Sequence, residues 1–176
     1  MAIEIVLKNV KKYYLDQIIG GYIKYNMSDI ISSYFYDKKK QKDIAYSDIE
    51  SLETYFNESG TCNIYLKKIH IGMELYEVLI LVGYDGEKGD ITLNFLEEQF
   101  RQMEKSKLKS NFYKVIQNLV ELCKCYEIDE IILGYEPAED DDMKMMEIRQ
   151  EQITNFNEDI HQSEVIQVLY QIANEI

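Results

Sequence analysis

The segment from Thr61 to Phe95 constrains the fold of this chain most strongly, because its residue pattern predicts three consecutive β-strands. In the first of them, hydrophobic residues recur at every second position. Leu75 to Tyr84 is apolar on both sides, which is typical of a central strand covered by helices. Asp85 to Asp90 contains two glycines among charged residues, as in the turn of a hairpin, and Ile91 to Phe95 alternates again. We therefore predict a three-stranded antiparallel meander.

Helical spacing of apolar residues predicts three helices before this meander. The first covers residues 15–23, where two glycines weaken or kink it. The second covers residues 28–35. The third covers residues 47–57, because Ser47 and Glu50 have the spacing of a capping box at a helix start.

Two further strands and two helices are expected outside these segments. Residues 3–7 alternate as a short opening strand with one solvent-exposed face. Residues 112–126 form the longest helical pattern, and its single apolar stripe should lie on the sheet. Residues 130–135 have the apolar centre of a short buried strand, which Pro137 ends because proline has no amide to donate. A final amphipathic helix is expected over residues 163–172.

Together these elements predict the α+β class. The chain forms a single domain over residues 1–176, with a mostly antiparallel sheet centred on about residues 75–84 and packed by helices. Its cysteines, Cys62, Cys123 and Cys125, are expected to be reduced thiols. No secretion signal and no apolar run of membrane-spanning length is recognisable, so we expect a cytoplasmic protein.

Charge is distributed very unevenly along the chain. Through Tyr126 there are 17 Lys and Arg against 18 Asp and Glu, whereas the last 50 residues carry two basic against 14 acidic side chains. This acidic C-terminal segment, residues 127–176, repels nucleic acid and anionic membranes and attracts basic macromolecules or cations. We therefore expect neither nucleic acid nor a membrane as partner.

The carboxylates are candidates for chemistry, but their spacing matches none of the familiar sites. Glu136 and the run from Glu139 to Asp142 could offer oxygen ligands to a divalent cation, yet they do not alternate around a glycine as in a calcium loop. The stretch from Gly83 to Gly89 lacks the lysine-serine pair of a phosphate loop. His70 and His161 have no serine, cysteine or carboxylate at a spacing that defines a triad. We expect no metal, no cofactor and no enzymatic activity.

Three segments together resemble the small, acidic immunity proteins of bacterial polymorphic toxin systems. They are Tyr34–Asp37, Tyr46–Leu52 and Gly89–Phe100, and in order of elements the resemblance covers residues 2–100. It implies a cytoplasmic, non-enzymatic protein that binds a cognate toxin domain and blocks its active site.

A basic toxin would suit the charge of the chain, because carboxylates can occupy a groove that normally holds phosphates. We predict that the contact face contains Tyr135, Glu136, Glu139, Asp140, Asp141, Asp142 and Glu147. Two alternatives stay open. One is a metal-dependent hydrolase that uses the clustered carboxylates, and the other is an acidic inhibitor that imitates nucleic acid by its surface charge.

Overall fold

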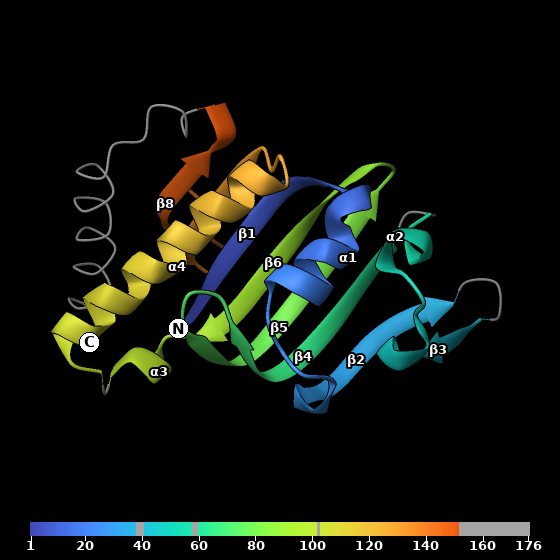
Figure 1. Ribbon diagram of the computed structural model, residues 1–176, viewed down its shortest axis with the longest axis horizontal. Coiled ribbons are helices and arrows are strands. Elements are labelled where there is room, and N and C mark those ends of the chain that lie inside the picture. Colours follow the sequence, from blue (N-terminus) through green and yellow to red (C-terminus); the bar gives the residue numbers. More distant parts are fainter. Residues whose placement is uncertain (38–40, 58–59, 102, 152–176) are drawn as a thin grey trace.

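One antiparallel sheet organises the chain. The structure is a computed structural model that describes residues 1–37, 41–57, 60–101 and 103–151. The sheet has eight strands in the order β3-β2-β4-β5-β6-β1-β7-β8, and each neighbouring pair is antiparallel (Figure 1). The strands are β1 (Ala2–Lys11), β2 (Ile30–Asp37), β3 (Lys42–Ile44), β4 (Gly60–His70), β5 (Glu74–Asp85), β6 (Lys88–Leu96), β7 (Glu130–Tyr135) and β8 (Lys144–Arg149). The predicted α+β class with a mostly antiparallel sheet is confirmed.

The predicted meander is confirmed as β4, β5 and β6. Ile80 on β5 pairs with Ile64 on β4 and with Leu93 on β6, and all three side chains are fully buried. Gly72 makes the turn between β4 and β5 with a φ of +75°, and a Cβ there would lie 2.5 Å from the carbonyl oxygen of Lys114. That turn therefore packs directly against the backbone of the long helix α4 (Lys105–Cys125).

The first strand lies inside the sheet, between β6 and β7. Ile5 pairs with Leu93 on β6 and with Leu133 on β7. The sequence predicts one solvent-exposed face for this strand, and that prediction is wrong. Glu4 and Val6 on that face are buried as well, because the connection between β7 and β8 covers them.

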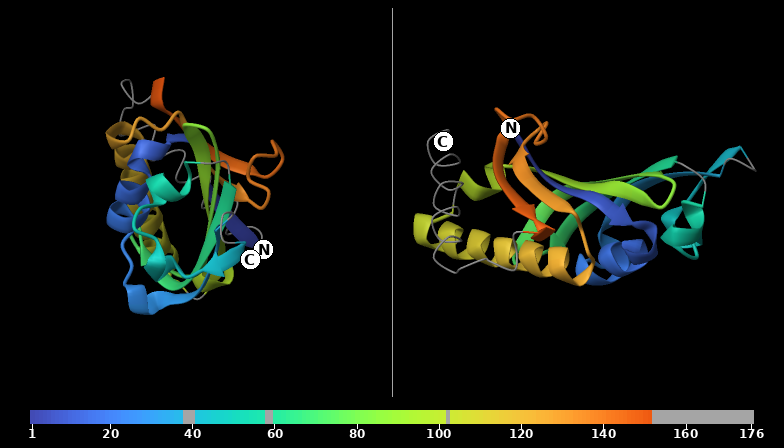
Figure 2. Two further views of the ribbon diagram at one scale, coloured as in Figure 1. Left: turned by 90° about the vertical axis from the view of Figure 1, so that its right-hand side faces the viewer. Right: turned by 90° about the horizontal axis from the view of Figure 1, so that it is seen from above.

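Helices α4, α1 and α2 lie on one face of the sheet (Figure 2). The predicted apolar stripe of α4 is confirmed, since Phe112, Ile116 and Leu119 are buried. The first predicted helix is confirmed, with its regularity broken near the two glycines: α1 (Leu15–Gln17) continues as the π-helical turn η2 (Ile18–Tyr22). The other short elements are α2 (Leu52–Tyr55), α3 (Glu98–Arg101) and the 3-10 turns η1 (Lys12–Tyr14), η3 (Met27–Asp29) and η4 (Tyr46–Asp48).

The helix predicted over residues 28–35 is wrong, because most of this segment forms β2. Ser33 pairs with Ile64 and Tyr34 with Asn63 across the β2–β4 ladder. The isoleucines and aromatic residues of the segment also suit a strand, and pairing with β4 decides between the two structures.

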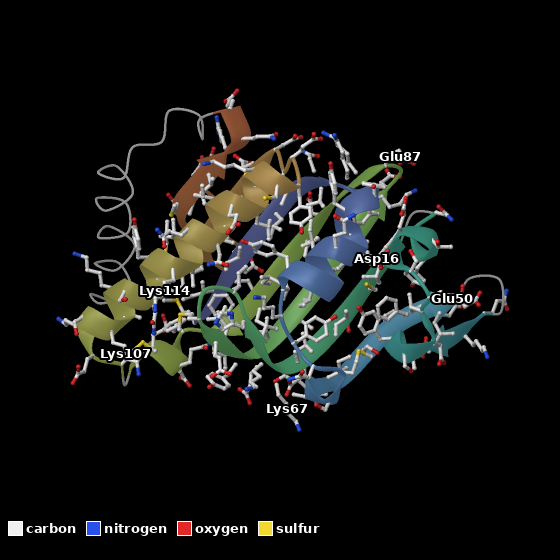
Figure 3. All side chains as sticks on the ribbon, in the orientation of Figure 1. Asp16, Glu50, Lys67, Glu87, Lys107 and Lys114 are labelled. Atoms are coloured by element: carbon white, nitrogen blue, oxygen red, sulfur yellow. The ribbon has the colours of Figure 1, made fainter. Side chains whose placement is uncertain are left out.

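The helix predicted over residues 47–57 is not continuous: the end of the 3-10 turn η4 and the single turn α2 lie in this segment. Its N-cap is Ser51, not Ser47. Asp16 on α1 reinforces this cap, because its Oδ1 accepts a hydrogen bond from the Leu52 amide at 2.7 Å (Figure 3). The helix predicted over residues 163–172 lies outside the described residues.

Candidate protein-binding face

The connection between β7 and β8 carries most of the predicted contact residues. We call residues 136–143 the acidic loop. Its amino end is tied to β1, because the Glu136 amide donates to the Ala2 carbonyl oxygen at 3.2 Å. Its two ends are tied to each other, because the Tyr135 amide donates to the Met143 carbonyl oxygen at 3.0 Å. The loop lies on the face of the sheet opposite the helices (Figure 2).

The middle of the acidic loop is anchored to the sheet by a buried polar contact. The Ala138 amide donates to Oε2 of Glu4 at 3.0 Å, and Oε1 of Glu4 accepts from the Asn94 side-chain amide at 3.3 Å. Around this contact, Ala138 forms a small apolar cluster with Val6 and Ile132. The cluster excludes water from the hydrogen bond, so the loop is held as part of the fold.

Gly134 allows the acidic loop to approach β7 closely. A Cβ at this position would lie 2.5 Å from the Met143 carbonyl oxygen and 3.1 Å from the Ala138 Cβ. Inside the loop, the Asp140 carbonyl oxygen accepts from the amides of Met143 and Lys144. These bonds close the turn immediately before β8 begins.

One carboxylate of the loop is neutralised by a lysine of β1. The Lys8 Nζ lies 2.6 Å from an oxygen of Asp90 and 2.6 Å from an oxygen of Glu139. Burial opposes the charged form of Lys8, but the hydrogen bonds to the two carboxylates outweigh it and raise the pKa of the ammonium group. Glu139 therefore forms an ion pair with the same molecule, although its side chain is 55% exposed.

A second group of charges lies on β7 and β8. The Lys144 Nζ is 3.2 Å from Glu147, and Arg149 pairs with both Glu147 and Glu130. A hydrogen bond that protonated Glu130 donates to the Glu147 carboxylate raises the pKa of Glu130. Burial would raise the pKa of Glu147, but its hydrogen bonds to Glu130, Lys144 and Arg149 outweigh burial and lower it. Glu147 is thus also held internally.

The remaining carboxylates of the acidic loop face solvent. Glu136, Asp140 and Asp142 are exposed and form no ion pair within the described residues. Asp141 is fully exposed, and its carboxylate lies 3.7 Å from the Lys144 Nζ. Four outward carboxylates with one nearby lysine give the tip of this loop a local negative charge.

The structure brings six of the seven predicted contact residues together on the loop and on β8. The exception is Tyr135, whose side chain is 6% exposed and belongs to the main core. It pairs with Ile3, and alternation along β7 turns its ring toward the helices. Its placement on the contact face is therefore corrected.

Sequence reasoning missed an uncharged surface beside the acidic loop. We call it the sheet patch, and it consists of two rows of register partners on β2, β4, β5 and β6, on the face opposite the helices. Tyr34 and Leu81 are 47% and 39% exposed. Alternation within the predicted strands would have found this surface if Leu75 to Tyr84 had not been interpreted as covered on both sides. One row contains Tyr34, Asn63, Leu81 and Thr92, and the other contains Ser32, Tyr65, Leu79 and Asn94.

Helix α4, on the other side of the sheet, carries charge of the opposite sign. Five exposed lysines lie on α4, against one glutamate, Glu121. Figure 3 labels two of them, Lys107 and Lys114. The lysines are Lys105, Lys107, Lys109, Lys114 and Lys124. Across the described part of the chain, the outward carboxylates of the loop and the lysines of α4 therefore lie on opposite sides of the sheet.

The part of the chain that the structure describes contains neither a cluster suited to a metal ion nor a helix suited to a membrane. Among the described residues, no cluster of three or more histidine, cysteine, aspartate or glutamate side chains is placed to hold a metal ion. None of the helices in the described ranges combines the length and the apolar character that a membrane crossing needs. The three cysteines are free, as predicted.

A charged loop fixed on a rigid sheet is typical of a small protein that acts by binding another protein. Comparison with known families identifies the class of binding protein. The model of the PABL017 Cdi1I immunity protein family matches residues 1–151, and the chain belongs to this family. It is therefore an immunity protein, which neutralises a toxin and is not an enzyme. The resemblance found in the sequence is confirmed, and the alternative of a metal-dependent hydrolase is set aside.

A solved structure shares the fold. It is the crystal structure of the toxic C-terminal tip of CdiA from Pseudomonas aeruginosa in complex with immune protein. The match has a TM-score of 0.60 with 16% sequence identity, and it covers 83% of this chain and 93% of that chain. At this identity the likeness shows the fold alone.

A curated protein matches part of the sequence. The serine/threonine-protein kinase TEL1 of Candida glabrata is 32% identical over 87 residues, which are 49% of this chain. The chain spans only 3% of the length of that kinase.

Proposed function

We propose that this chain neutralises a basic toxin domain in the cytoplasm by direct binding, with the acidic loop at the contact face. Two findings support a toxin of the CdiA type as the partner. The chain belongs to the Cdi1I immunity protein family, and a similar fold occurs in a complex that contains a CdiA toxin tip.

The separation of charge between the two sides of the sheet carries the proposal that the partner is basic. A basic domain is attracted to the loop that holds Glu136 and Asp140 to Asp142, and it is repelled by the lysines of α4. Such a field orients an approaching partner before contact and raises the association rate. The same field disfavours nucleic acid at the loop.

Imitation of nucleic acid is less well supported. It requires carboxylates at regular, phosphate-like intervals over one face. Instead, Glu139 forms an ion pair with Lys8, and Glu147 forms ion pairs with Lys144 and Arg149. The residues of the neighbouring sheet patch are all uncharged.

The proposal is tested by removing the outward charges of the loop. In the test variant, Asp140 to Asp142 are all replaced by asparagine. Its association rate is measured with the cognate CdiA-type toxin domain, purified in an inactive form, over a range of salt concentrations. We expect an association rate about tenfold lower at low salt and a weaker salt dependence.

A matched control removes three charges elsewhere. Glu50, Glu104 and Glu121 are exposed, and their replacement by glutamine changes the net charge equally. This variant should retain most of the wild-type rate. If both variants lower the association rate equally, the rate depends on the net charge of the whole protein, and the loop is not the contact face. If the wild-type protein does not bind the toxin domain, the proposed function is wrong.

A further inference from the structure

We propose that the sheet patch is the apolar centre of the toxin interface and that the acidic loop is part of its charged rim. This inference rests on the proposed function. It adds a second surface that the charge pattern does not reveal, and it assigns the affinity of the complex to uncharged side chains.

The sheet patch has the composition of an interface centre. Its eight residues include two tyrosines and two leucines, and none is charged. Protein interfaces are enriched in aromatic residues and depleted of charge at their centre, with polar and charged residues around the rim. The strands hold these side chains in fixed positions, so little conformational entropy is lost when a partner orders them.

The exposure of the patch contrasts with the rest of the same rows. Leu81 pairs with Thr92, which pairs with Val6, which pairs with Ile132. At the far end of this row, Val6 and Ile132 are 3% and 4% exposed, because Ala138 of the acidic loop covers them. At the near end Leu81 is 39% exposed. Within the described ranges, the loop thus covers one half of this face and leaves the other half open.

The patch and the loop together have the breadth of a standard interface. They extend from β2 to β7, which are six adjacent strands. With about 4.8 Å between strands, this is about 24 Å. A standard interface buries roughly 800 Å² on each partner, which corresponds to a disc about 30 Å across.

Charge decides between a basic partner and a second copy of this chain. The formal net charge is −13, so self-association would bring two strongly acidic molecules together. A basic toxin domain meets no like charge on the patch and finds Asp140 and Asp142 at its edge. The occupant we assign is therefore the toxin domain.

The experiment places charges of both signs at the centre of the patch. Leu81→Arg and Leu81→Glu are compared with wild type by equilibrium binding to the same inactive toxin domain. If Leu81 is buried at the interface, both substitutions leave a charge without solvent, and both should raise the Kd at least tenfold. If the patch acts only through its electrostatic field, arginine should weaken binding of the basic partner and glutamate should strengthen it.

Matched controls use an exposed tyrosine outside the patch. Tyr13 in η1 is 63% exposed, so Tyr13→Arg and Tyr13→Glu introduce the same charges elsewhere, and both should leave the Kd within twofold of wild type. Melting curves confirm that each variant is folded. A further variant, Tyr65→Ala, tests the patch without introducing a charge and should also weaken binding.

Each outcome decides the matter. Weaker binding of both Leu81 variants with unaffected Tyr13 variants supports the inference. If the Leu81 variants leave the Kd unchanged, or shift it in opposite directions, the sheet patch is not the interface centre, while the proposed function stands. A wild-type protein that does not bind overturns both. A wild-type dimer in sedimentation that the Leu81 variants dissociate assigns the patch to a second copy instead and overturns the inference.

Discussion

Replacing Glu4 by alanine should loosen the acidic loop, by an amount that follows from two hydrogen bonds. The substitution removes the acceptor of the Ala138 amide and of the Asn94 side chain. Ala138 is 0% exposed, so its amide cannot bond to water in place of Glu4. An unsatisfied buried donor costs about 1–3 kcal/mol, while the partly exposed Asn94 regains water and adds little. We expect a loss of about 2–3 kcal/mol in the free energy of unfolding.

This loss is measurable in two ways. For a chain of this size, about 1 kcal/mol corresponds to a shift of roughly 2–4 °C in Tm, so thermal unfolding of Glu4→Ala should begin clearly below that of wild type. Hydrogen exchange should show that the Ala138 amide loses its protection. The control is Glu4→Gln, which keeps an acceptor oxygen and should cost about 1 kcal/mol, because a neutral acceptor forms a weaker bond.

An unchanged unfolding temperature of Glu4→Ala, together with a protected Ala138 amide, would contradict this expectation. The loop would then be held by its apolar cluster alone, and the buried carboxylate would have no part in placing the acidic residues.

Three further predictions concern the fold. Gly72→Ala should destabilise the protein by about 2 kcal/mol or more in urea unfolding, because it combines a positive φ with a clash against α4, whereas Gly86→Ala, with a φ of +77° and open space, should cost about 1 kcal/mol. At neutral pH, only the thiol of the exposed Cys125 should react with a thiol reagent. The other two thiols are buried, and burial raises the pKa of Cys62 to about 12, so all three should react only after unfolding. Burial also raises the pKa of Tyr25 above its ordinary value of 10.0, so its contribution to stability is complete below pH 10.0 and should be lost as the pH rises further. In a pH titration, exposed tyrosines such as Tyr13 should ionise in the folded protein, and a further rise in tyrosinate absorbance should accompany unfolding.

The parts of the fold that follow from local pattern could be predicted from the sequence. The alternation in residues 61–95 reports directly on which side chains face the core, and the apolar stripe of residues 112–126 reports on a helix that lies on the sheet. Residues 30–37 could not be assigned in this way, because their apolar residues follow helical spacing although the segment forms a strand. Their structure depends on pairing with β4, about 30 residues later in the chain.

The candidate site could be predicted only in its charge. Composition alone pointed to the acidic run that ends at Asp142, but the ion pairs of Glu139 and Glu147 join residues from distant strands. The burial of Glu4 depends on a loop 134 residues away. Tyr135 was misplaced because one position along a strand decides which face a side chain occupies.

The interior position of β1 determines when the acidic loop can take its place during synthesis of the chain. Its neighbours β6 and β7 are translated long after it, so the first strand leaves the ribosome without a partner. The support under the acidic loop exists only once residue 138 has emerged and β7 has joined β1. A prematurely terminated chain that contains the whole meander would still lack the anchored acidic loop, so any contact that this loop makes requires translation through β8.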